Sequence, residues 1–105
     1  MDDYLYLILL SRTGESEAPF KDRLSAFWTH VLREHLEDFQ KVYAEKTAFE
    51  RHGDRLSRTY LVEEDATANL VKRLREKGME FEPIDPADVY SKYEASPPDW
   101  FWIEH

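Results

Sequence analysis

Residues 41–63 read KVYAEKTAFERHGDRLSRTYLVE, and the structure of this stretch decides the fold. In one interpretation, residues 41–51 form a strand that turns back at His52-Gly53 into a second strand over residues 56–63. In the other, one helix runs over residues 19–52 and ends at Gly53, because glycine commonly follows the C-terminus of a helix. Both interpretations are open at the level of sequence.

We prefer the hairpin for two reasons. A turn at His52-Gly53 would set Phe49 opposite Leu56 and Tyr43 opposite Val62, which are favourable cross-strand pairs. A single helix of about thirty residues would be about 45 Å long and would overhang a domain of this size.

The segments on either side of this stretch predict an α+β fold. Tyr4–Leu10 is apolar on both faces, which is typical of a central strand. From Pro19, apolar residues recur every three or four positions and predict a helix that ends near Glu37 or Asp38. A second helix is expected from an N-cap at Asp65 to Gly78, and residues 79–81 form a short strand.

These elements give the order β-α-β-β-α-β, the ferredoxin-like arrangement, in which two helices cover one face of an antiparallel sheet. We expect residues 1–105 to form a single domain, since 105 residues with 42% apolar content are enough for one core. Residues 84–105 are expected to be an irregular C-terminal extension that packs on the domain or on a partner.

Composition narrows the classes of partner. The net charge of −8 opposes binding to a phosphate backbone, so we expect no direct nucleic-acid binding. The longest apolar run, Tyr4–Leu10, is too short to cross a bilayer, and the chain opens with Met-Asp-Asp, without basic residues. We therefore expect no membrane association and a cytoplasmic location.

The sequence carries no motif of the common enzyme classes. Its three glycines, at positions 14, 53 and 78, form no phosphate-binding loop or dinucleotide-binding turn, and there is no zinc-binding helix or calcium loop. The absence of cysteine removes thiol nucleophiles and thiolate metal sites. We expect no cofactor and no metal, and the sequence leans towards a non-enzymatic protein while leaving catalysis by scattered residues open.

The predicted hairpin offers a first group of candidate binding residues. In the expected register, Tyr43 and Glu45 lie beside Arg58 and Tyr60 on a face that points away from the helices, because smaller residues occupy the other face. This group suits a small polar aromatic or acidic ligand. The plainer interpretation is a salt bridge flanked by tyrosines.

His35 is a further candidate, because it falls in the middle of the apolar stripe of the first predicted helix. A buried imidazole there would be either a general base tuned by its surroundings or a core side chain that hydrogen-bonds the backbone. The second interpretation is the simpler one.

The C-terminal aromatic residues Trp100, Phe101 and Trp102 form a second candidate group. Aromatic side chains dominate the hot spots of protein interfaces, and a chain end is normally polar. We expect this tail to pack on its own sheet, to clasp a second copy, or to bind a different protein.

Two functional hypotheses follow. The leading one is a non-enzymatic regulatory or protein-interaction protein, forming a homodimer, that uses its sheet face and aromatic tail to engage another protein. An acidic inhibitor of another protein is a special case of it. The alternative is a small dimeric ferredoxin-like enzyme or small-molecule binder with a tyrosine-lined pocket.

Overall fold

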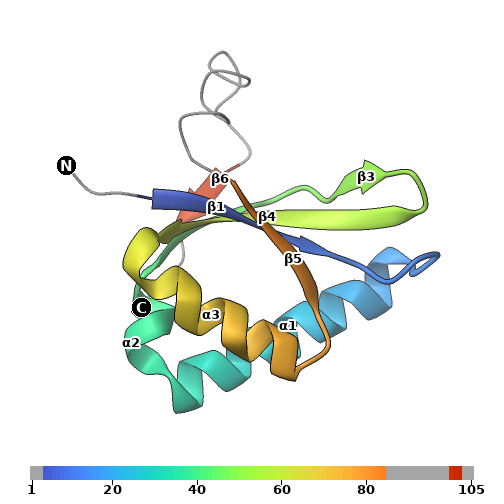
Figure 1. The fold of residues 1–105 in the computed structure, drawn as a ribbon. Coiled ribbons are helices and arrows are strands. Elements are labelled where there is room, and N and C mark those ends of the chain that lie inside the picture. Colours follow the sequence, from blue (N-terminus) through green and yellow to red (C-terminus); the bar gives the residue numbers. More distant parts are fainter. Residues whose placement is uncertain (1–3, 85–99, 103–105) are drawn as a thin grey trace.

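One antiparallel sheet lies on a layer of helices in the computed structural model, which describes residues 4–84 and 100–102 (Figure 1). The elements in chain order are β1 Tyr4–Leu10, α1 Glu17–Glu34, α2 Leu36–Gln40, β2 Val42–Lys46, β3 Glu50–His52, β4 Arg55–Glu63, α3 Glu64–Glu76, β5 Glu80–Ile84 and β6 Trp100–Trp102. The predicted small α+β domain with an antiparallel sheet is confirmed. The exact order β-α-β-β-α-β is not, because α2, β3 and β6 are additional elements.

The sheet has the strand order β5-β1-β4-β2-β6. The short strand β3 is not part of this order and pairs with β4. Every pairing is antiparallel. The apolar strand β1 lies between β5 and β4, as its two-sided apolar pattern predicts. Figure 1 shows helices α1, α2 and α3 on one side of the sheet, and no helix of the described residues lies on the other side.

Residues 41–63 form strands, so the alternative of one helix over residues 19–52 is wrong. The turn lies one residue later than predicted: His52 pairs with Arg55, which leaves Gly53 and Asp54 as the two turn residues. Gly53 has a φ of 64° and is the only one of the two with a positive φ. This is the pattern of a type II′ turn, which places glycine at its first central position.

Both cross-strand pairs expected for the hairpin are wrong in register. Phe49 precedes β3, and Leu56 pairs instead with Arg51. In β2, Val42 pairs with Val62 and Ala44 with Leu61, so the register shifts at Tyr43. Such a bulge leaves the extra residue outside the ladder.

The two faces of the sheet are the reverse of those predicted. Leu56, Tyr60 and Val62 of β4 pack in the main core with the helices rather than pointing away from them. Ala44 lies on the opposite face, in a smaller buried cluster with Tyr6 and Leu61. The physical reason is volume: the space between sheet and helices needs large apolar side chains, which small residues would leave unfilled.

Helix α1 contributes its predicted apolar stripe only in part. Phe20, Leu24, Phe27 and Val31 are buried, but Leu36, after the end of α1, is 48% exposed. The helix ends at Glu34 rather than near Glu37 or Asp38, because the backbone of His35 leaves the helical conformation at φ −139° and ψ 55°. The apolar spacing of the sequence continues past Glu34, but helix α1 does not.

The second half of the chain follows its predicted order more closely. Helix α3 begins at Glu64, with Glu63 rather than Asp65 at the N-cap, and Gly78 follows its end with a φ of 68°. Strand β5 includes Pro83. A proline is tolerated there because β5 is an edge strand, where the missing N–H group can face away from the sheet. Within the described residues, no helix has the length and apolar character needed to span a membrane.

Candidate functional site

Glu45 and Arg58 form an ion pair across strands β2 and β4. The distance from Glu45 Oε1 to Arg58 Nη2 is 3.5 Å, and the two side chains are only 17% and 12% exposed. Their proximity follows from the register, since Glu45 pairs with Tyr60, two residues along β4 from Arg58. An ion pair this well shielded is screened less by salt than a surface pair.

Arg58 also holds the segment that connects β2 to β3. Its Nε donates a hydrogen bond to the carbonyl oxygen of Lys46 at 3.0 Å, and its Nη2 donates to that of Thr47 at 3.1 Å. The guanidinium carbon lies 4.7 Å from the centre of the Phe49 ring, within cation–π range. These contacts give Arg58 a clear structural role.

Tyr60, the register partner of Glu45, is completely buried. Its ring centre is 4.8 Å from that of Trp28 in α1. Burial, and secondarily the negative charge of Glu45, raise the pKa of Tyr60 well above its ordinary value. The Glu45 carboxylate and Trp28 Nε1 both lie near enough to Tyr60 Oη to influence its pKa. Among the described residues, however, neither Tyr60 Oη nor Trp28 Nε1 has a partner in hydrogen-bond geometry.

The structure therefore brings together three of the four candidate residues of the predicted hairpin, Glu45, Arg58 and Tyr60. Tyr43 is 44% exposed and its ring contacts that of Tyr4 in a tilted arrangement, with 5.1 Å between ring centres, instead of joining Tyr60. His35 is half-buried between α1 and α2, where its ring lies 5.6 Å from that of His30. Trp28 is the residue that the sequence did not single out, because its apolar spacing showed only that it faces the sheet.

The edge of the sheet at β2 is the second candidate site. Trp100, Phe101 and Trp102 pair antiparallel with Lys46, Glu45 and Ala44. An extended aromatic segment thus occupies an edge that would otherwise present unpaired backbone groups. The rest of the predicted C-terminal extension lies outside the described residues.

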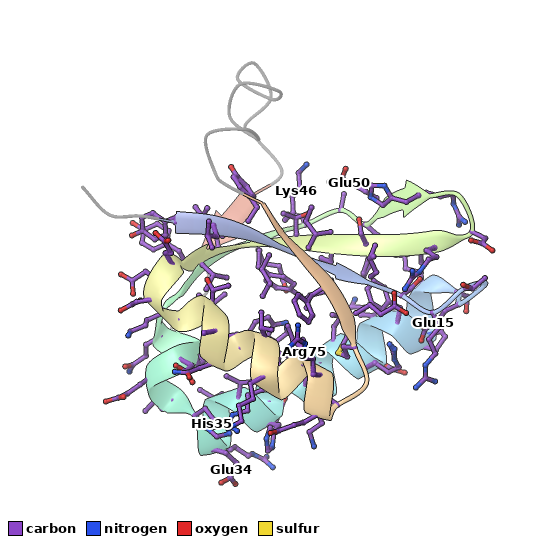
Figure 2. The ribbon with its side chains drawn as sticks, viewed as in Figure 1. Glu15, Glu34, His35, Lys46, Glu50 and Arg75 are labelled. Atoms are coloured by element: carbon purple, nitrogen blue, oxygen red, sulfur yellow. The ribbon has the colours of Figure 1, made fainter. Side chains whose placement is uncertain are left out.

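The face of the sheet opposite the helices is polar at its hairpin end. Lys46 Nζ lies 3.0 Å from Glu50 Oε1, and Figure 2 shows both side chains projecting from this face. His52 Nε2 and Ser57 Oγ are 2.8 Å apart on the neighbouring strands. Tyr6 and Leu61, near the other end, are buried.

An open groove of about 540 Å³ runs along the outer surface of α1, where Asp22, His30 and Arg33 are among its lining residues. All of its described lining residues come from this one helix, so no other described element closes the groove from the opposite side. The described residues contain no group of three or more His, Asp or Glu side chains that could hold a metal ion.

Comparisons of the chain with protein-family models, with curated proteins and with solved structures give no match.

Proposed function

We propose that this chain is a non-enzymatic protein-interaction domain that binds an extended segment of protein along β2. The observation that carries the proposal is the antiparallel pairing of Trp100–Trp102 with Ala44–Lys46 at the edge of the sheet. Addition of a strand to a sheet edge is a common mode of peptide recognition, in which backbone hydrogen bonds supply affinity and side chains supply specificity. The β2 edge is thus already in the conformation that accepts a strand.

The surroundings of this edge support the same proposal. Tyr43 lies on β2 with almost half of its surface exposed, and tyrosine is enriched at interface hot spots. The net charge of −8 favours a basic partner, which would fit a regulatory protein or an acidic inhibitor. Trp100, Phe101 and Trp102 are the segment that such a partner would replace or extend.

The order of the main elements supports a ferredoxin-like sheet. If α2, β3 and β6 are additions, the remaining elements run β1-α1-β2-β4-α3-β5, which is the order β-α-β-β-α-β. We propose that the domain is a ferredoxin-like sheet whose β2 edge has gained a binding role.

A peptide of residues 97–105 tests the β2 edge directly. The full-length chain carrying Phe101→Pro and Trp102→Pro would lose its own β6, because the N–H groups of a strand alternate in direction and one of these two must face β2. We expect the labelled peptide to bind this variant, measured by fluorescence anisotropy, and to bind the unaltered chain at least about tenfold more weakly.

The matched control is the same peptide with both proline substitutions, which should not bind either chain. Equal binding of the two peptides would show that the association needs neither strand pairing nor the side chains of Phe101 and Trp102. Failure of the unaltered peptide to bind a folded proline variant would contradict the proposal.

A second candidate function, small-molecule binding at the Glu45–Arg58–Tyr60 cluster, has one observation in its favour. Trp28 Nε1 and Tyr60 Oη are buried polar atoms without partners among the described residues, and a ligand oxygen could accept a hydrogen bond from each. The separation of Tyr43 and His35 from this cluster, and the use of Arg58 by backbone carbonyls, weigh against it. A ligand held there would raise the melting temperature of the unaltered chain but not of Trp28→Phe.

A further inference from the structure

Strand β6 is short and is separated from the rest of the described chain by a long stretch of sequence. It spans three residues, fewer than a typical strand, and therefore contributes few backbone hydrogen bonds. Residues 85–99 connect it to β5. Release of so short a strand breaks only its pairing with β2 and leaves β1 to β5 paired with one another.

The length of the connection allows more than one destination for this strand. A stretch of about 15 residues spans up to roughly 50 Å when extended. The largest dimension of the molecule is 34 Å. A connection that returns to its own β2 is thus also long enough to reach β2 of a neighbouring copy.

Pairing within one chain and between two chains would use the same contacts. The register of Lys46, Glu45 and Ala44 with Trp100, Phe101 and Trp102 is a property of the two strands and not of how they are connected. Exchange of an identical element between copies is a low-cost route to a dimer, and reciprocal exchange gives a closed two-fold assembly. Protein concentration therefore decides between the two arrangements.

We propose that two copies of this chain exchange their C-terminal strands, so that β2 of each copy pairs with Trp100–Trp102 of the other. The partner that fits the β2 edge is thus a second copy of the same chain. This inference rests on the proposed function, because it requires that β2 accept a strand at its edge. The inference identifies the strand that binds β2 as Trp100–Trp102 of the second copy. The β2 edge is then fully paired only when such a C-terminal strand is bound.

Two single-cysteine variants test the exchange, and the natural chain contains no cysteine that would interfere. Ala44 and Trp102 are register partners. Paired residues of antiparallel strands have Cα separations suited to a disulfide. Ala44→Cys in one chain and Trp102→Cys in another, distinguished by tags of different size, are mixed and oxidised gently. Strand exchange predicts a covalent heterodimer on a non-reducing gel.

The control for random collision pairs Trp102→Cys with Lys72→Cys, because Lys72 is exposed on α3. We expect the Ala44→Cys mixture to give at least about tenfold more heterodimer than this control. Equal amounts in the two mixtures would overturn the exchange. A second register pair, Lys46→Cys with Trp100→Cys, repeats the test if the variant at buried Ala44 does not fold.

The double variant Ala44→Cys/Trp102→Cys, studied when dilute, separates the two proposals. A disulfide within one chain, without heterodimer in the mixing experiment, would refute the exchange and leave the β2 edge as a strand-binding site. A folded double variant that forms no disulfide within or between chains would refute the pairing itself, and with it the proposed function.

Discussion

Tyr60 is a titratable residue on which the surroundings act strongly. Burial raises its pKa first, and the negative charge of Glu45 adds to the effect. The unfolded side chain ionises near its ordinary value of 10.0, whereas the folded side chain ionises only at a higher pH. The contribution of Tyr60 to stability is therefore complete below pH 10 and is lost as the pH rises through the folded pKa.

We predict that Tyr60→Phe reduces this alkaline loss of stability. At pH 7 the variant should be as stable as the unaltered chain or up to about 1 kcal/mol more stable, because the hydroxyl is buried without a described partner. Urea unfolding at neutral pH and above pH 10 measures both effects. Tyr43→Phe, at an exposed tyrosine, is the control. A loss of about 1 kcal/mol at pH 7 would show instead that the Tyr60 hydroxyl is hydrogen-bonded.

Among the elements, the β3–β4 hairpin shows what the sequence could predict. Gly53 indicated a tight turn, but the local pattern did not fix which of its neighbours completes that turn. The reversal of the sheet faces has a related origin, because alternation separates two faces without saying which one the helices cover. The bulge at Tyr43 adds a register shift that residue spacing does not reveal.

The candidate site was predictable only where it depends on neighbouring strands. Glu45 and Arg58 meet because β2 and β4 are paired, and the sequence placed both residues in one hairpin. The contact of Trp28 with Tyr60 depends on how α1 packs against the sheet, and the β6 pairing joins residues more than fifty positions apart. Contacts of this kind are set by the whole fold, which no local pattern encodes.

The turn itself gives a test at the scale of the element. Gly53→Ala should destabilise the domain by about 1 kcal/mol, because its φ of 64° is in the left-handed region that a Cβ disfavours. Open space surrounds the position, so the cost is conformational and not steric crowding by neighbours. Asp54→Ala, at the next turn residue, should change stability by less than about 0.5 kcal/mol. Equal losses in thermal unfolding would assign the effect to the turn as a whole and not to the φ of Gly53.

At the scale of the whole molecule, net charge distinguishes the two kinds of partner considered for the β2 edge. Two copies of a chain with a charge of −8 repel each other, whereas a basic protein is attracted. Salt screens both interactions, with a Debye length of about 8 Å at physiological ionic strength. Added salt should therefore favour association of the chain with itself and weaken its binding to a basic partner.

We predict that the dimer fraction rises when the NaCl concentration increases from about 50 mM to about 500 mM, because strand pairing is unaffected while the repulsion between copies is screened. Sedimentation velocity at fixed protein concentration measures the change. The variant with prolines at positions 101 and 102 is the control and should stay monomeric at both concentrations, since its tail cannot pair with β2. A dimer that dissociates as salt is added would instead be held together by ion pairs between copies, and strand exchange would not be its main source of stability.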